Sequence, residues 1–155
     1  MLRANPRSKR NASGGYFVIV ASKYNSRYVE AMLRAARKEF AQAKATVKVV
    51  RVPGAFEIPA VAAKLAKLDA ANLSGIVCLG VILRGATTHA QHIGEAVSNS
   101  LATIQIHFQV PIIHEVLLLE NEDQAKARCL SPTHNRGTEA AQTAIEMARV
   151  MSSLD

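Results

Sequence analysis

The sequence predicts an α/β protein in which one parallel sheet carries helices on both faces. Two observations lead to this fold class. Four short apolar segments alternate along the chain with longer segments in which apolar residues recur at helical spacing. The short segments are apolar almost throughout, which is typical of strands buried on both faces of a parallel sheet. Right-handed crossovers join such strands, so we expect three layers in the order helices, sheet, helices.

The first half of the chain predicts two βα units. The apolar run Tyr16–Ser22 predicts a strand, and Asn25 or Ser26 can cap the helix that follows it. The β-branched stretch Thr46–Val52 predicts the second strand, after which Pro53-Gly54 turns the chain. The apolar face of the next helix consists of Ile58, Val61, Ala62, Leu65 and Leu68.

The second half predicts two further strands and three helices. Ile76–Leu83 is the third strand, and Val110–Leu119, with Pro111 near its start, is the fourth. The helix between them is expected to turn Ile93, Val97, Leu101 and Ile104 inward. Two helices, about Asp123–Leu130 and about Gly137–Met151, complete a four-stranded α/β domain.

Composition indicates one domain. A chain of 155 residues with 49% hydrophobic residues can fill a core without metals or disulfides. We expect a flexible basic arm over residues 1–15, which contains Arg3, Arg7, Lys9 and Arg10, and a single domain over residues 16–155. No apolar run has the length of a membrane span or the layout of a secretory signal, so a cytoplasmic protein is expected. Cys78 and Cys129 are interpreted as reduced structural thiols.

The net charge of +7 suits an anionic partner. A nucleic-acid-binding module that uses the basic arm would bind DNA or RNA with a steep salt dependence and would lose this affinity without residues 1–15. Because aromatic RNP motifs and zinc-finger spacings are missing, we do not expect nucleic acid as a partner. A small anionic substrate accounts for the charge more economically.

Polar residues that can carry chemistry follow the predicted strands. In a parallel sheet the ligand site lies beyond the carboxyl ends of the strands. There, Gly85-Ala86-Thr87-Thr88-His89 opens a helix whose free N–H groups can bind an anion beside an imidazole, although threonine at a helix start is also a common cap. Glu57 can accept hydrogen bonds from a polyol or simply favour a helix start. Arg128 and Arg136 can clamp phosphate or lie on the surface.

Two long motifs in the correct order relate these residues to one family. The segments VPGAFEIP, residues 52–59, and GVILRGATTH, residues 80–89, closely resemble the two signature stretches of lumazine synthases. The resemblance extends from about Tyr16 to Met151. It implies a flavodoxin-like α/β/α sandwich that assembles as a pentamer or a multiple of pentamers, with each active site between neighbouring subunits.

The resemblance also implies an activity and its residues. Lumazine synthases are transferases of riboflavin biosynthesis that condense 5-amino-6-(ribitylamino)uracil with 3,4-dihydroxy-2-butanone 4-phosphate, with loss of phosphate and water and without a cofactor or metal. His89 matches the proton-transfer histidine, and Ala86, Thr87 and Arg128 match the phosphate site, to which Arg136 is a possible addition. The expected pyrimidine and ribityl contacts are Tyr24, Ala55, Phe56, Glu57, Val81, Ile82, Leu83 and His114.

The chain departs from the family pattern at several positions. The family commonly has Phe at His114, Gly at Glu115, Thr at Leu118 and Lys at Arg136, and residues 130–135 replace a Gly- and Lys-containing turn. These departures lie where the neighbouring subunit is expected to complete the wall of the active site and where pentamers are expected to contact one another. The alternative function is a non-catalytic paralogue that binds lumazine or flavin or only forms a shell.

Overall fold

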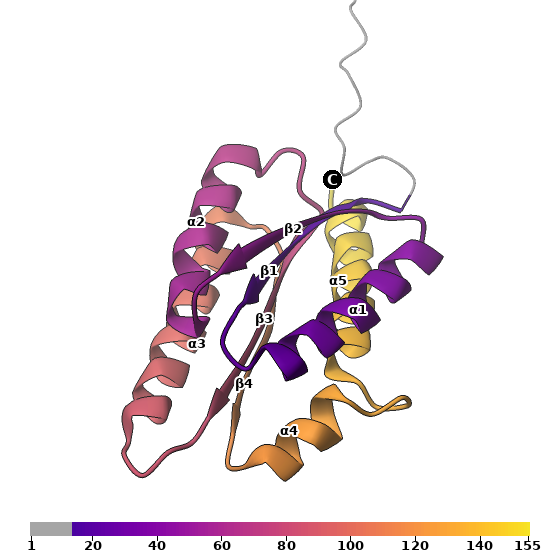
Figure 1. Cartoon of the computed structure of the whole chain (residues 1–155). Helices are drawn as coiled ribbons and strands as arrows, with labels where there is room; N and C mark the ends of the chain where they lie inside the picture. The colour runs from indigo at the N-terminus through magenta and orange to yellow at the C-terminus, as the bar shows by residue number, and fades with distance from the viewer. Residues whose placement is uncertain (1–13) are drawn as a thin grey trace, which may run out of the picture.

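The computed structural model describes residues 14–155, and it confirms the predicted α/β class (Figure 1). This part of the chain forms one sheet of four parallel strands in the order β2-β1-β3-β4. The strands are β1 (Tyr16–Ser22), β2 (Thr46–Val52), β3 (Gly75–Leu83) and β4 (Ile112–Leu119). The basic arm predicted over residues 1–15 lies, up to residue 13, outside the described residues.

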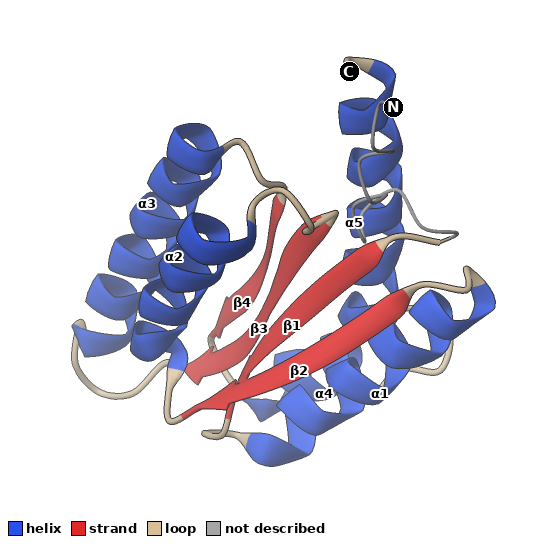
Figure 2. Ribbon diagram, turned by 90° about the horizontal axis from the view of Figure 1, so that it is seen from above, coloured by secondary structure: helices blue, strands red, loops and turns tan. Residues whose placement is uncertain are grey.

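The helices cover both faces of this sheet and make a three-layer, flavodoxin-like sandwich (Figure 2). One layer contains α2 (Ile58–Asp69) and α3 (His89–Phe108), and a short 3-10 helix, η2 (Ala55–Glu57), precedes α2. The other layer contains α1 (Ser26–Gln42), α4 (Glu122–Cys129) and α5 (Arg136–Ser153). Within residues 14–155, no helix combines the length and apolarity that crossing a lipid bilayer requires.

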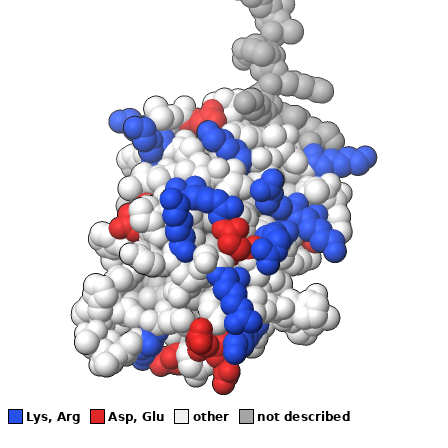
Figure 3. Space-filling view, viewed as in Figure 1, with Lys and Arg blue, Asp and Glu red and all other residues white. Residues whose placement is uncertain are grey.

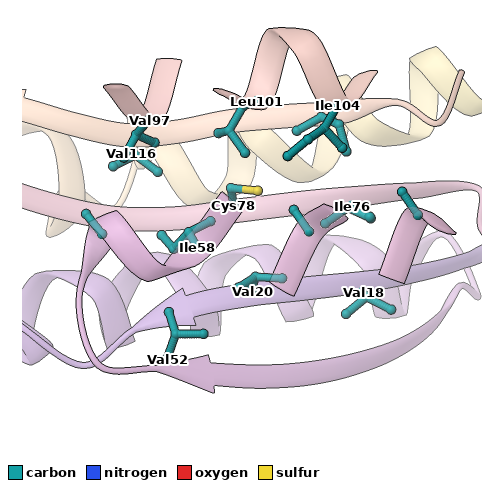
Figure 4. Close-up of a cluster of buried hydrophobic side chains, with 14 of the residues drawn as sticks. Val18, Val20, Val52, Ile58, Ile76, Cys78, Val97, Leu101, Ile104 and Val116 are labelled. Carbon is teal, nitrogen blue, oxygen red and sulfur yellow. The ribbon is translucent and has the colours of Figure 1, made fainter. Parts of the chain in front are cut away.

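Alternation along the strands divides the hydrophobic core into two parts. Val18 and Val20 of β1 point toward α2 and α3, where they pack with Cys78 and Leu101 (Figure 4). Phe17 and Ile19 point the other way, and the Phe17 ring lies 4.6 Å from the ring of Phe40 in α1, measured between centroids. Each such side chain contributes about 1.5–3 kcal/mol when fully buried. Packing on both faces therefore fixes the position of the central strands, and with it the edge of the sheet at which their carboxyl ends lie.

The fourth strand begins two residues later than the predicted start at Val110. Pro111 has no N–H to donate to a strand ladder, and its carbonyl oxygen instead accepts the N–H of Ile76, 2.8 Å away. The side chain of Gln105 then accepts the N–H of Ile112, at 2.9 Å. Strand pairing thus starts at Ile112 and runs to Leu119 opposite β3.

The two cysteines are buried free thiols, as the sequence predicts. Burial raises the pKa of Cys78 to about 12. For Cys129 burial is again the largest cause, and the pKa is raised to about 11. Both thiols therefore stay protonated and unreactive near neutral pH.

Positive charge is concentrated on one part of the surface. Residues 23–51 hold eight Lys or Arg against two Glu, whereas residues 52–155 hold seven Lys or Arg against ten Asp or Glu. Figure 3 shows basic side chains gathered over the region of α1 and β2. More than half of the described Lys and Arg residues therefore lie in the segment that contains these two elements.

Candidate active site

A cavity of about 720 Å³ opens beyond the carboxyl ends of the strands, where a parallel α/β sheet is expected to bind its ligand. Three segments line it: the turn after β1, the turn that contains η2, and the end of β3 together with the first two turns of α3. The lining residues that the sequence also predicts are Tyr24, Ala55, Phe56, Glu57, Val81, Ile82, Leu83 and His89.

The turn after β1 is fastened to the end of β3. Asn25 has a left-handed backbone with φ of 56°, and its side-chain amide donates to the carbonyl oxygen of Val81 at 2.7 Å. Asn25 occupies the N-cap position of α1, as the sequence predicts, but its side chain makes no cap hydrogen bond. The Asn25 carbonyl accepts the N–H groups of Tyr28 and Val29 instead. Asn25 thus holds two walls of the cavity together.

Two exposed aromatic rings flank the cavity. Tyr24 is 72% exposed and Phe56 62% exposed. Gly54 permits the close approach of Tyr24, because a Cβ at Gly54 would lie 3.0 Å from Cδ2 of that ring. Flat apolar faces that remain open beside a cavity are suited to stacking on a planar heterocycle.

Glu57 supplies the acidic group of this wall. Its Oε2 accepts the backbone N–H of Gly54 at 3.0 Å, which fixes the carboxylate at the turn. Because the side chain is exposed at the cavity and a carboxylate accepts several hydrogen bonds, it can still bind ligand hydroxyl groups. Glu57 can therefore both stabilise the turn at the helix start and accept hydrogen bonds from a polyol.

The start of α3 leaves backbone N–H groups open to the solvent. Residues 85–89 are all exposed, and nothing lies within 4 Å of a Cβ built at Gly85. Thr87 accepts the N–H of His89 through its hydroxyl, at 3.3 Å. Thr88 occupies the N-cap position without a side-chain cap bond, and its Oγ1 lies 3.3 Å from Nε2 of His92. Such a helix start can bind an anion through its free N–H groups and dipole.

His114 lies outside the cavity lining, on the edge strand β4. Its Nδ1 accepts the backbone N–H of Val116 at 3.1 Å, and its Nε2 lies 2.7 Å from the Ser98 hydroxyl. Burial lowers the pKa of His114, so the neutral ring is favoured. Both nitrogens are used inside the subunit, which leaves the ring face for contact with another molecule.

Arg128 and Arg136 also lie outside the cavity lining. Arg128 is exposed on the last turn of α4 and forms no hydrogen bond or ion pair with the described residues. Arg136 binds Glu139 at 2.9 Å and lies 3.7 Å from Glu115 of β4. Burial raises the pKa of Glu115, and the nearby Arg136 partly opposes this rise. Glu115 and Arg136, two positions at which the chain departs from the family pattern, thus form one ion pair between β4 and α5.

The unusual turn at residues 130–135 satisfies its own polar groups. The Ser131 hydroxyl accepts the N–H of Thr133 and that of His134, at 3.3 and 3.0 Å. Asn135 donates to the Cys129 carbonyl at 2.7 Å and caps α5 by accepting the N–H of Gly137 at 2.8 Å. This turn therefore fixes the relative placement of Arg128 and Arg136.

The site also includes residues that the sequence analysis did not assign. Asn25, Gly54, His92, Ile93 and Ala96 line the cavity. The last three follow His89 by three, four and seven positions, which is the spacing of one helix face. This spacing was a signal that could have identified them from the sequence.

Fold and site together define a class of protein: a flavodoxin-like domain whose cavity beyond the carboxyl ends of its strands combines two exposed aromatic rings, a carboxylate and an imidazole at the start of a helix. A family model described as 6,7-dimethyl-8-ribityllumazine synthase matches residues 14–152. The chain belongs to this family.

Individual relatives agree with the family match. A 6,7-dimethyl-8-ribityllumazine synthase of Stenotrophomonas maltophilia, strain R551-3, is 36% identical over 148 residues, which cover 94% of each chain. The protein of the same name from Xanthomonas campestris pv. campestris, strain B100, is 35% identical over 141 residues, which cover 89% of this chain and 90% of the relative. The similarity therefore extends over nearly the whole of both chains.

Proposed function

We propose that this chain is a transferase of riboflavin biosynthesis that forms 6,7-dimethyl-8-ribityllumazine from 5-amino-6-(ribitylamino)uracil and 3,4-dihydroxy-2-butanone 4-phosphate. The observation that carries the proposal is the single cavity that unites Tyr24, Phe56, Glu57 and His89. The relatives named above carry this activity in their names, and they match the chain over most of its length.

Each group has a role that its chemistry permits. Tyr24 and Phe56 stack on the pyrimidine, the Glu57 carboxylate accepts ribityl hydroxyl groups, and Val81, Ile82 and Leu83 form the apolar floor with Ala55 beside it. The backbone at Ala86 and Thr87 binds the phosphate. His89 transfers protons while the imine forms and the ring closes. The enzyme accelerates the condensation mainly by holding both substrates in contact.

We further infer that the working unit is a homo-oligomer, most simply a pentamer, in the cytoplasm. The supporting observation is that none of the Lys and Arg residues in the described part of the chain lines the cavity, Arg128 included, and that His114 does not line it either. If Arg128 binds the phosphate, it must therefore reach the cavity of a second copy. The free ring face of His114 is available to border the pyrimidine of that copy in the same way.

The test is a turnover assay with the full chain and both substrates, in which lumazine and inorganic phosphate are measured together. We expect both products in equal amounts, and a rate lowered about 10- to 1000-fold in His89→Ala with little change in pyrimidine binding. His107→Ala is the matched control, because His107 is exposed on the same helix and does not line the cavity. Pyrimidine binding without either product would support the non-catalytic alternative instead.

A further inference from the structure

The cavity contains a second imidazole, His92, to which the family resemblance assigns no role. We propose that His92 is a second acid–base residue of the site, which donates a proton to the phosphate group as it leaves. His89 then serves as the partner base. This inference rests on the proposed function, because it assigns a base and an acid to one step of that reaction, the loss of phosphate.

The two imidazoles are placed by one helix. His89 is the first residue of α3 and His92 follows one turn later, so both side chains leave the helix on the same side. Both are exposed, and both line the cavity of about 720 Å³. Two imidazoles, which can each donate or accept a proton, therefore face one ligand.

Thr88 connects His92 to the expected phosphate position. Its Oγ1 lies 3.3 Å from Nε2 of His92, and this hydroxyl does not cap the helix. When the ring is protonated, Nε2–H can donate to Thr88 while Nδ1–H, which has no partner among the described residues, stays available for a ligand. The open N–H groups at the start of α3 lie beside Thr88, so a phosphate bound there is next to the imidazolium.

Among residues 14–155, no carboxylate forms an ion pair with His92. Across the cavity, Glu57 of η2 is bound to the N–H of Gly54. On α3, Glu95 accepts from Gln91 at 3.1 Å. From β4, His114 is bound to Ser98. The other titratable groups that line the cavity are Tyr24 and His89, and Arg84, which precedes α3, binds Glu120 and Gln91. A bound phosphate is thus the anion with which His92 can form a hydrogen bond.

The chemistry of phosphate loss needs both a base and an acid. After the imine has formed, His89 takes a proton from the hydroxyl-bearing carbon that is bonded to the imine carbon. That electron pair forms a carbon–carbon double bond, and the bond between the terminal carbon and the phosphate oxygen breaks. The oxygen keeps the electron pair of the broken bond and takes the proton of His92. His89 gains one proton and His92 loses one, and exchange with water restores both rings.

The first experiment measures binding of inorganic phosphate by calorimetry at about pH 6 and about pH 8 for the wild type, His92→Gln and His92→Arg. The titration of phosphate itself is common to all three proteins. The ratio of each variant's affinity to that of the wild type therefore isolates the effect of the side chain at position 92. For His92→Gln we expect an affinity lower by on the order of tenfold at pH 6, with a much smaller difference at pH 8. His92→Arg should bind at least as tightly as the wild type at both values, because arginine stays charged.

The second experiment measures phosphate release in a single turnover with the pyrimidine and the phosphorylated ketone. His92→Gln should slow release about 10- to 100-fold, and His92→Arg should remain slow although it binds phosphate, because a guanidinium does not give up its proton. His107→Gln, on the same helix but away from the cavity, is the matched control and should equal the wild type.

The outcomes separate this inference from the proposed function. A wild type that forms no lumazine would overturn the proposed function and, with it, the role of His92 in phosphate loss. An active wild type that is matched by His92→Gln in both assays would overturn the role of His92 alone. Restoration of fast release by His92→Arg would show that only positive charge is needed, which also contradicts proton donation.

Discussion

The replacement of His114 by phenylalanine should lower the stability of the fold in a manner that depends on pH. The ring accepts the outward N–H of Val116, 3.1 Å away, and so satisfies a donor of the edge strand β4. Phenylalanine cannot accept this bond, and the donor, which is partly buried, would then lack a partner in the protein. Ser98, the other partner, is exposed and can bind water instead. We therefore expect His114→Phe to lose about 1–2 kcal/mol at pH 8.

This difference should shrink in acid. Burial lowers the pKa of His114 in the folded state, so the unfolded chain binds more protons than the folded one between the folded pKa and the unfolded value of about 6.5. The stabilisation by the neutral ring is full above about pH 6.5 and is lost as the pH falls from there toward the folded pKa. The phenylalanine variant does not have this pH dependence.

The assay is urea unfolding, followed by circular dichroism at about pH 8 and about pH 5.5. Protein concentrations must be equal, because oligomers gain apparent stability with concentration. His134→Phe is the control, since His134 is exposed and its ring makes no hydrogen bond with the described residues. A gap between His114→Phe and the wild type that stays the same at both pH values would refute the reasoning, and so would a more stable variant.

Three further predictions follow from the packing and the shared site. Arg128→Ala should raise the KM for the phosphorylated ketone at least tenfold and leave pyrimidine binding unchanged, and unchanged steady-state kinetics for that ketone would remove Arg128 from the site. Gly137→Ala should lower the free energy of unfolding by about 3 kcal/mol or more in urea titrations, because its Cβ would lie 2.0 Å from the Met32 carbonyl oxygen, a contact that only backbone movement relieves. Dilution to monomers should abolish turnover, so an active monomer in sedimentation at the assay concentration would contradict a site completed by a second copy.

The elements of the fold are predictable from the sequence because their signals are local. Apolar runs and helical spacing depend on which faces are buried, and they identify all four strands and the five α-helices of residues 14–155. The start of β4 was predicted two residues early because hydropathy does not distinguish Val110 from strand residues, whereas the missing N–H of Pro111 does. Asn25 occupies the predicted N-cap position, but the bond of its side chain to Val81 spans 56 positions, and no local pattern reveals it.

The site was predictable to the extent that it is built from contiguous motifs. The segments around Phe56 and His89 carry most of the cavity lining, and both stand out in the sequence. His92 is not predictable from the motif, because the motif ends at His89 and His92 lies on the next turn of the same helix. The pairing of Glu115 with Arg136 was missed because each looked like a separate departure until β4 and α5 were seen side by side.

The strand order has a consequence for how the chain folds during its synthesis. Because β1 lies between β2 and β3, the N-terminal βαβ unit can form as soon as Val52 has left the ribosome, but the other edge of β1 stays open until β3 is complete at Leu83. At about 5–20 residues per second this interval lasts roughly 2 to 6 s. During that time the apolar strand Tyr16–Ser22 presents unpaired N–H and C=O groups to other nascent chains. Slow translation of residues 53–83 should therefore favour aggregation, and this segment is where codon choice would have the largest effect on the yield of folded protein.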